Sequence, residues 1–208
     1  MVYLTGDTHG DIQRFKQGKL RWLGKKDTVV VLGDFGFVWD GSAAERKRLD
    51  WLRKRPYTIL FLDGSHENYD LLAQYPETEL FGGRVQSLGG NVYHVCRGSV
   101  LELEGKKYLF AHAMTSHPDV REEDRYYMRG TMDIDCFFFE GIDGYISMCG
   151  HTPTDSIVWK KDRRYLDEPG NSIWCNDRHN VYLLDCGCGF AGGRLACLCL
   201  ETKERFYA

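Results

Sequence analysis

The sequence predicts an α/β fold and a single domain over residues 1–208. Three apolar segments, at residues 2–5, 28–32 and 57–62, have the length and composition of buried strands. A stretch of helical composition at 11–19 separates the first two, and a clear helix separates the second from the third, so strand and helix alternate as in a parallel sheet. The segment at 28–32 is apolar throughout, which predicts that both faces of the sheet are covered.

The helix between the second and third strands is predicted over residues 42–55. Ser42 stands at the N-cap position and Glu45 at the capping-box position, and Pro56 follows the last turn. Leu49 and Leu52 supply its buried side. The basic residues of this helix are interpreted as a solvated face. A short helix is also predicted near residues 69–72.

From residue 81 onward, frequent glycines and short apolar runs predict strands joined by tight turns. The expected strands are residues 91–96, 99–103, 107–111 and 145–149. Residues 118–129 are expected to be a mobile or helical cover, 133–140 a short helix and 160–170 a surface loop. The C-terminal segments 180–185, 194–201 and 205–207 are predicted to form a set of antiparallel hairpins.

Composition excludes several classes of function. The chain has 208 residues, 43% of them hydrophobic, which suits a globular protein with a sizeable core. Its formal charge of −3 argues against a nucleic-acid or membrane-surface role, because both favour a basic excess. No apolar run approaches a membrane span and no signal-peptide pattern opens the chain, so a cytoplasmic location is expected by default.

Eight cysteines are more than a chain of this size needs, and four form the pairs Cys186/Cys188 and Cys197/Cys199. Their spacing differs from the zinc pattern of two intervening residues. Reduced thiols that pack as small hydrophobic side chains are the favoured interpretation, and a zinc or redox role is the alternative.

Residues that can bind a metal stand directly after five of the predicted strands. These residues are Asp7, His9, Asp34, Ser65 or His66, His112 and His151. The ends of neighbouring parallel strands meet at one edge of a sheet, so these side chains can converge on one point. Either His112 or His117, which is followed by Asp119, can be the ligand of the fourth segment, and His112 is preferred because it directly ends a strand.

A set of oxygen and imidazole donors without thiolate suits Mn, Fe or Zn, and a central carboxylate such as Asp34 can bridge two ions. Two ions about 3.5–4 Å apart can polarise a phosphoryl oxygen and lower the pKa of a bridging water. Hydrolysis of a phosphate ester is the chemistry that such a site performs best.

Five ordered motifs resemble those of the calcineurin-like metallophosphoesterases. They are Gly-Asp-Thr-His-Gly-Asp at 6–11, Gly-Asp at 33–34, Gly-Ser-His-Glu at 64–67, Ala-His-Ala at 111–113 and Gly-His-Thr-Pro at 150–153. The last motif and the segment 184–195 are similar to the branch of serine/threonine protein phosphatases and diadenosine tetraphosphatases. The resemblance spans nearly the whole chain.

The resemblance implies a four-layer α/β/β/α sandwich of two mixed β-sheets flanked by helices. It also implies two divalent metal ions, with Mn expected first and Fe, Zn or Mg as alternatives. Asp7 and His9 would hold the first ion and Asp34 would bridge. His112 and His151 would hold the second, together with Ser65 at the position of the family's Asn.

In the same resemblance His66 is a catalytic residue that faces the leaving-group oxygen, beside Asp34, which would act in catalysis as the bridging carboxylate. Glu67 is expected to support its loop. The implied activity is hydrolysis of phosphomonoesters by a metal-activated hydroxide, with a phosphorylated small molecule, nucleotide or phosphoprotein as substrate. The alternatives are a nucleotide phosphoanhydride hydrolase and a catalytically weakened member that serves as a binding or regulatory module.

The chain departs from the family pattern at one metal-ligand position and at the positions that bind phosphate. Ser65 replaces an Asn that is a better metal ligand, which predicts a weaker second site. Residues 35–39 replace the Asp-Arg-Gly of the branch, and Asn68 stands near the place of its second arginine. The candidate substitutes are Arg97, Arg121, Arg125 and Arg129, each also readable as a surface residue. The aromatic loop at 35–41 is expected to wall a pocket, and His94 and His179 are expected to be structural or surface residues.

Overall fold

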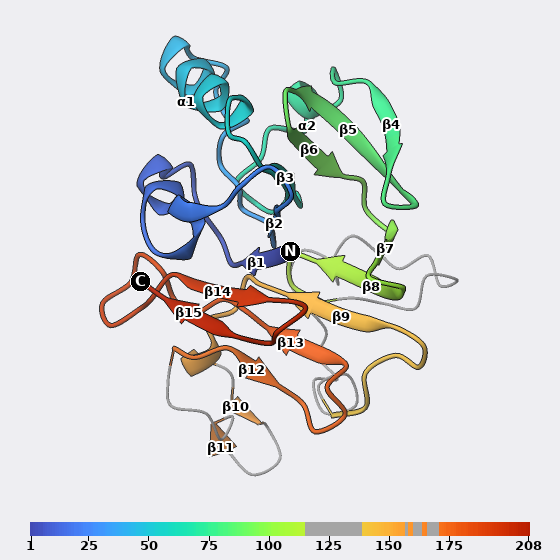
Figure 1. Ribbon diagram of the computed structural model, residues 1–208. Helices are drawn as coiled ribbons and strands as arrows, with labels where there is room; N and C mark the ends of the chain where they lie inside the picture. The colour runs from blue at the N-terminus through green and yellow to red at the C-terminus, as the bar shows by residue number, and fades with distance from the viewer. Residues whose placement is uncertain (115–138, 157, 160–163, 166–170) are drawn as a thin grey trace.

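The computed structural model describes residues 1–114, 139–156, 158–159, 164–165 and 171–208. Two mixed β-sheets form the body of the fold (Figure 1). The strands of the larger sheet are β1 (Val2–Thr5), β2 (Thr28–Val31), β3 (Thr58–Phe61), β4 (Glu77–Leu80), β5 (Gly83–Gly89), β6 (Val92–Val95), β14 (Ala196–Cys199) and β15 (Arg205–Tyr207). Their order is β15-β14-β1-β2-β3-β6-β5-β4. The four strands β1, β2, β3 and β6 run parallel, and the flanking strands pair antiparallel.

The smaller sheet is built from β7 (Val100–Leu103), β8 (Lys106–Ala111), β9 (Ile146–Cys149), β12 (Trp174–Cys175) and β13 (Val181–Leu183). Its order is β12-β13-β9-β8-β7, with β8, β9 and β13 parallel. A separate ribbon pairs β10 (Val158–Trp159) with β11 (Arg164–Tyr165). The α/β fold with two mixed sheets is therefore confirmed.

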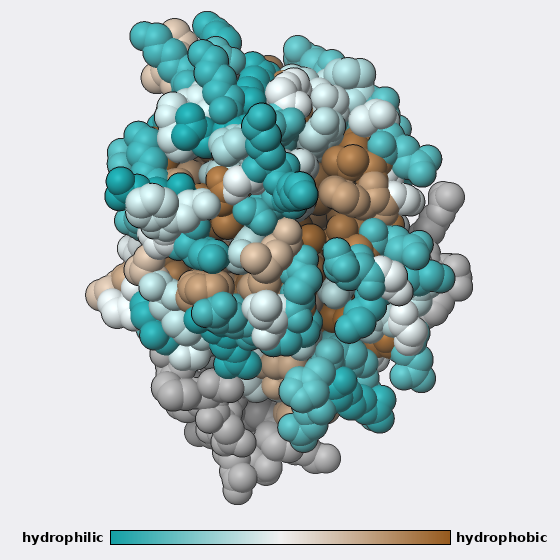
Figure 2. Space-filling view, in the orientation of Figure 1, coloured by the Kyte–Doolittle hydropathy of each residue, from teal (hydrophilic) through white to brown (hydrophobic). Residues whose placement is uncertain are grey.

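An apolar core lies between the two sheets. It joins Leu4 and Leu60 of the larger sheet to Phe110 and Met148 of the smaller one. In Figure 2, hydrophobic residues are visible in the middle of the face, and hydrophilic residues cover most of the rest. Burial of both inner faces is what holds the two sheets together.

A second core lies on the outer face of the larger sheet, because alternate strand residues point to opposite sides. Val29 and Val31 of β2 belong to this core. The 3-10 helices η1 (Ile12–Lys16) and η2 (Lys19–Trp22) and the helix α1 (Ala43–Arg53) cover it with Phe15, Leu20 and Leu52. The predicted covering of the strand at 28–32 on both faces is confirmed.

The predicted helix starts are confirmed in part. Ser42 caps α1, since its Oγ accepts a hydrogen bond from Glu45 N at 3.1 Å. A short α2 (Tyr69–Leu72) follows Asn68, whose side chain accepts a hydrogen bond from Leu71 N. The first helical segment is two 3-10 helices in place of one helix, with Gly18 at φ 53° between them.

One C-terminal expectation is wrong. Strands β14 and β15 form the predicted antiparallel hairpin, but β13 lies in the other sheet and runs parallel to β9. The short strand β13 is buried at every residue and so carries no pattern that tells one partner from the other. The chain passes from one sheet to the other through residues 184–195.

The packing expected of the four paired cysteines is found for three of them, since Cys188 is only half-buried. Cys197 and Cys199 are buried in the core under the helices, and Cys186 is buried between the sheets. All three thiols are free. Burial raises the pKa of both Cys186 and Cys197 to about 12, so these thiols stay protonated at neutral pH.

Several expectations fall outside the described residues. These are the cover at 118–129, the helix at 133–140 except its helical last two residues, and most of the loop at 160–170. The fourth, helical layer expected over the smaller sheet depends on the first two of them. In the part of the chain that the structure describes, no helix has the length and apolar character needed to cross a membrane.

Candidate metal centre and adjoining pocket

The parallel strands of both sheets deliver the candidate ligands to one edge. Asp7 and His9 follow β1, Asp34 follows β2, and Ser65 and His66 follow β3, whereas His112 and His151 follow β8 and β9 of the smaller sheet. Register fixes this convergence, since the last residues of β1, β2 and β3 are directly paired. The site forms because the ends of parallel strands lie side by side.

The loop after β1 is fastened to the loop after β2 by backbone bonds. Thr8 N and His9 N both donate to Asp34 O, at 3.2 and 2.8 Å, and Gly10 N donates to Phe35 O at 2.8 Å. Three candidate ligands have left-handed backbone, namely His9 at φ 47°, Asp34 at φ 42° and His151 at φ 66°. Left-handed conformations of non-glycine residues cost energy and concentrate at functional sites.

Asp34 is buried at the centre of the cluster, with imidazole nitrogens around its carboxylate. The nearest is His66 Nδ1, at 2.7 Å from Oδ2, and His112 Nε2 lies 3.6 Å from Oδ1. His9 Nδ1 lies 4.0 Å from Oδ2. Burial opposes ionisation of Asp34, but the nearby His112 and the hydrogen bonds from His66 hold its pKa below the ordinary value.

Asp7 is the second buried carboxylate. Its oxygens lie 3.9 Å from His9 Nε2 and 4.0 Å from His112 Nδ1, and Oδ1 accepts a hydrogen bond from His151 N at 3.3 Å. Burial and the carboxylates of Asp185 and Asp34 raise its pKa well above the ordinary value. A divalent cation would relieve this concentration of negative charge.

Among the described residues, two groups of three side chains could each hold a metal ion, since the donor atoms within each group lie within 4.8 Å of one another. One group is Asp7, His112 and His151, and the other is His9, Asp34 and His66. This grouping differs from the one that the resemblance implies, in which Asp7 pairs with His9 and His66 holds no metal. All the residues predicted to form the site nevertheless lie around one space.

His112 shows that the residues fit a metal ion. Its ring is fully buried, and Nδ1 lies 3.2 Å from Leu32 O, which requires the proton to be on Nδ1. Nε2 therefore carries a lone pair, finds no hydrogen-bond partner and faces Asp34 Oδ1. Burial lowers the pKa of His112 to about 4, so the ring is neutral at neutral pH. Two acceptors that face each other in a buried site are a ready pair of ligands for a cation.

Ser65 lies beside Asp34. Its Oγ is 3.3 Å from both Asp34 oxygens and 3.2 Å from His66 Nδ1. Ser65 is exposed, so it reaches the rim of the cluster where the family carries the Asn side chain. The hydroxyl is thus near enough to the site to contribute an oxygen.

Glu67 supports the loops, as expected. Its buried carboxylate accepts hydrogen bonds from Gly36 N at 2.7 Å and Gly64 N at 2.6 Å, so it ties the loop after β2 to the loop after β3. Burial raises the pKa of Glu67 to about 8 despite these two bonds.

Asp185 and Arg14 belong to the site but were not predicted. Asp185 follows β13, is buried, and accepts a hydrogen bond from Gly187 N at 2.8 Å. Arg14 is buried and donates to Asp7 O and to Cys188 O, which joins the first ligand loop to the C-terminal segment. Two sequence signals pointed to Asp185, namely its position after a strand and its place in the segment 184–195 that resembles the phosphatase and tetraphosphatase branch.

Arg97 binds the buried carboxylate of Asp63 and not the open side of the candidate metal site. Asp63, which is 2% exposed, accepts hydrogen bonds from Arg97 and lies 2.9 Å from His94 Nε2. Burial opposes its ionisation, but His94 and Arg97 hold the pKa of Asp63 below the ordinary value. The structural role expected for His94 is confirmed. His179 is exposed, as expected.

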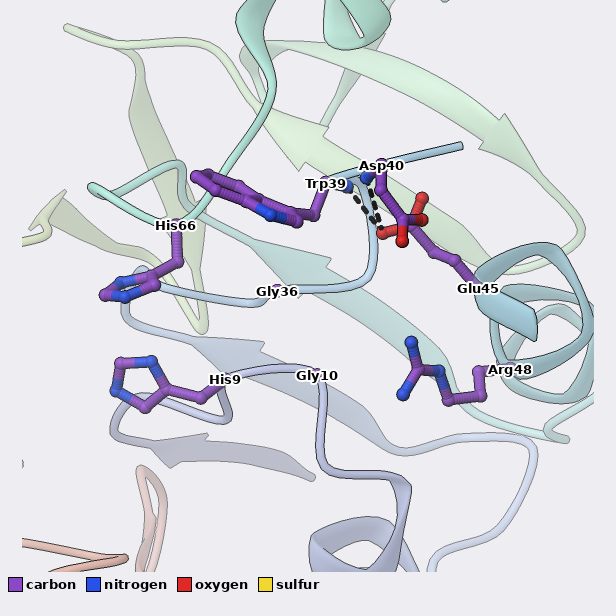
Figure 3. A pocket seen from close by; sticks show the side chains of 8 residues that line it. All are labelled: His9, Gly10, Gly36, Trp39, Asp40, Glu45, Arg48 and His66. Carbon is purple, nitrogen blue, oxygen red and sulfur yellow. Dashed lines mark hydrogen bonds between the residues drawn. The ribbon is translucent and has the colours of Figure 1, made fainter. Parts of the chain in front are cut away.

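A pocket adjoins the metal cluster, as Figure 3 shows. Its lining residues are His9, Gly10, Gly36, Trp39, Asp40, Glu45, Arg48 and His66. The aromatic loop walls it in part, since Trp39 is 52% exposed, whereas Phe35 and Phe37 are fully buried in the core under the helices. Arg48 lies on the helix face that was interpreted as merely solvated.

Four further candidates lie outside the described residues. They are His117, the rival of His112, and three of the arginines considered for phosphate binding, Arg121, Arg125 and Arg129. Their predicted roles therefore stay predictions.

A family model described as calcineurin-like phosphoesterase matches residues 1–186 of the chain. Searches of curated proteins and of solved structures gave no match. The matched segment contains every candidate ligand from Asp7 to His151. The family match does not distinguish between the branches of the superfamily, so the assignment to the protein phosphatase and diadenosine tetraphosphatase branch stays a prediction. The chain belongs to the calcineurin-like phosphoesterase family.

Proposed function

We propose that this metal-dependent phosphoesterase hydrolyses phosphomonoesters of small molecules with two divalent metal ions. Asp7 and His9 would hold the first ion, His112, His151 and Ser65 the second, and Asp34 would contact both. Bound ions would polarise the phosphoryl oxygens and lower the pKa of the attacking water. Manganese is proposed first because the donors are carboxylate and imidazole, with Fe, Zn and Mg as alternatives.

His66 is proposed to assist the leaving group. Its Nδ1 bonds to Asp34 Oδ2, and because a carboxylate only accepts, Nδ1 carries the proton of that bond. Among the described residues Nε2 makes no hydrogen bond, and the ring lines the pocket (Figure 3). Nε2 is therefore the nitrogen left free for substrate, and it would give a proton to the oxygen leaving phosphorus when the ring carries a proton on both nitrogens.

The observation that carries the proposal is the facing pair of acceptors, His112 Nε2 and Asp34 Oδ1, at 3.6 Å. The pair lies inside a buried cluster that also contains Asp7. Without a cation, this arrangement sets the lone pair of Nε2 against a carboxylate and leaves Nε2 without a hydrogen-bond partner, whereas Asp34 Oδ1 accepts a hydrogen bond from His66 N at 2.9 Å. A structural role alone gives no reason to bury such a pair at the ends of five strands.

Hydrolysis of p-nitrophenyl phosphate by protein depleted of metal and then supplied with Mn, Mg, Zn or Fe tests the proposal. We expect activity that depends on added ion and a fall in kcat of about 10²–10⁴-fold in His66→Asn, the range typical of a lost general acid. His179→Asn is the matched control and should keep full activity, because His179 is exposed and lies in the turn between β12 and β13. Unchanged activity in His66→Asn would require another acid.

A weakened member of the family, used as a binding or regulatory module, is the second candidate. Ser65 favours it, as does the absence of the branch's arginine from residues 35–39, because both changes weaken the grip on metal and phosphate. Tight metal binding without turnover on phosphomonoesters, phosphodiesters, phosphopeptides and dinucleoside polyphosphates would support this candidate over the enzyme. Turnover of phosphopeptides or of dinucleoside polyphosphates alone would redirect the substrate assignment to a phosphoprotein or a phosphoanhydride.

A further inference from the structure

The pocket beside His66 has two distinct ends. His9 and His66 form the end at the metal cluster, and Arg48 and Glu45 of α1 form the other, with Trp39 above the gap between them (Figure 3). Its volume is about 220 Å³. This is below the ~300–1,000 Å³ of sites that enclose drug-sized ligands, so it suits one ring with a substituent better than a peptide.

Trp39 is an exposed ring on a fixed backbone. Trp39 N donates to Glu45 Oε1 at 2.5 Å, and Trp39 O accepts a hydrogen bond from Asn68 Nδ2 at 3.0 Å. Glu45 is 4% exposed and also accepts from Gly41 N at 2.7 Å, so a buried carboxylate sets the shape of this loop. The indole lies 6.1 Å from the His66 ring, centroid to centroid. A ring held beside the proton donor in this way is a ready platform for a flat leaving group.

Arg48 is a cation that makes no close ion pair in the described part of the chain, although it lies near enough to the Asp40 carboxylate to interact with it electrostatically. It stands three residues after Glu45 on α1, so both side chains lie on the face of the helix at the pocket. The neighbouring arginines of the helix are engaged, because Arg46 donates to Gly41 O and Arg53 to Asp50 at 2.8 Å. Arg48 makes no hydrogen bond or ion pair with the described residues, and in Figure 3 its guanidinium points into the gap.

The two carboxylates at this end already have hydrogen-bond donors of their own. The Asp40 carboxylate accepts a hydrogen bond from Ser42 N at 2.8 Å, at the start of α1. Glu45 is surrounded by the backbone N–H groups of the Trp39 loop. The guanidinium is therefore the group at this end that can form two hydrogen bonds with a ligand carboxylate or phosphate.

We propose that the preferred substrate is a phosphate ester whose leaving group combines a flat ring with a second anionic group. The scissile phosphate would lie at the metal cluster, the ring under Trp39, and the second anion at Arg48. In the reaction a water oxygen bonds to phosphorus, the bond from phosphorus to the leaving oxygen breaks, and that oxygen takes a proton from His66. The proposal rests on the proposed function and names its substrate class.

Four substrates that vary the two features independently test the proposal. They are 4-carboxyphenyl phosphate (ring and anion), p-nitrophenyl phosphate (ring only), phosphoglycolate (anion only) and glycerol 2-phosphate (neither). Hydrolysis is measured with wild type, Trp39→Leu, Arg48→Met and the control Lys47→Met, whose exposed side chain stands on the same helix but does not line the pocket.

We expect wild type to have its highest kcat/KM on 4-carboxyphenyl phosphate. Arg48→Met should lower kcat/KM about tenfold more for the two substrates with a second anion than for the other two, the loss expected for a charge-assisted hydrogen bond at a partly exposed site. Trp39→Leu should discriminate in the same way between ring and non-ring substrates, and Lys47→Met should match wild type.

Equal losses across all four substrates in Arg48→Met would overturn the proposal, because Arg48 would then bind the scissile phosphate. Substrate preferences unchanged in both variants would also overturn it, while leaving the phosphoesterase itself intact. Absence of metal-dependent hydrolysis of every substrate would instead contradict the proposed function. Circular dichroism of each variant separates these results from loss of folding.

Discussion

Where the loops after β1 and β2 meet, Gly10 and Gly36 leave no room for a side chain on either residue, and this provides the sharpest test of how the site is built. Gly36 has φ +72°, and a Cβ on it would lie 2.4 Å from Gly10 N and 2.6 Å from His9 C. Both of these atoms are backbone and cannot rotate aside. Gly36→Ala should therefore push the loop that carries His9 away from the loop that carries Asp34.

The expected loss in the free energy of unfolding follows from two effects. An alanine in left-handed backbone costs roughly 1–2 kcal/mol, and forcing atoms into a packed region costs a further ~1–3 kcal/mol. Gly82→Ala is the matched control, because Gly82 has φ +75° but no atom within 4 Å of the added Cβ. The control should show only the first loss, so Gly36→Ala should be the less stable variant by about 1–3 kcal/mol.

Urea unfolding in metal-free buffer measures the stability, and calorimetric titration measures the affinity for Mn²⁺. Gly36→Ala should also weaken Mn²⁺ binding by about tenfold or more, the usual effect of disturbing the support of metal ligands, whereas Gly82→Ala should not. Equal stability losses in the two variants, together with equal metal affinity, would refute the idea that this glycine contact sets the spacing of the ligand loops.

Three further changes probe separate parts of the account. Asp63→Ala should lower the free energy of unfolding by about 3–5 kcal/mol, because it removes the buried anion that Arg97 and His94 contact. Urea unfolding measures this change, and a stability loss no larger than that of a typical surface substitution would contradict it. Glu45→Ala should cost about 2–4 kcal/mol, since three backbone N–H groups lose their acceptor, and it should raise proteolysis within residues 39–41. Ser65→Asn should tighten binding of the weaker of two Mn²⁺ ions in a calorimetric titration, and unchanged affinity would mean that Ser65 is not a ligand position.

The strand ends were predictable because their signal is local. An apolar run that stops at glycine and continues with Asp or His fixes both the strand and the place where its ligand leaves the sheet. Parallel pairing then brings Asp7, Asp34 and His66 to one edge with no further information. The same reasoning extends to His112 and His151 once the second sheet packs on the first.

The supporting residues could not be predicted, because their roles depend on where separate segments meet. From the sequence alone Arg14 is interpreted as a surface residue, but in the fold it donates a hydrogen bond to Cys188 O. Glu45 has the spacing of a capping box, yet its carboxylate accepts hydrogen bonds from the loop before the helix. Arg48 likewise reads as a solvated residue, and only the position of the Trp39 loop makes it part of a pocket.

The central claim is that six residues, which follow five strands far apart along the chain, surround two metal ions. Anomalous scattering from crystals loaded with Mn²⁺ tests it most directly. We expect two peaks that share Asp34, one in contact with Asp7 and His9 and the other with His112 and His151. Peaks away from these side chains, or no peak in protein shown by elemental analysis to contain manganese, would contradict it.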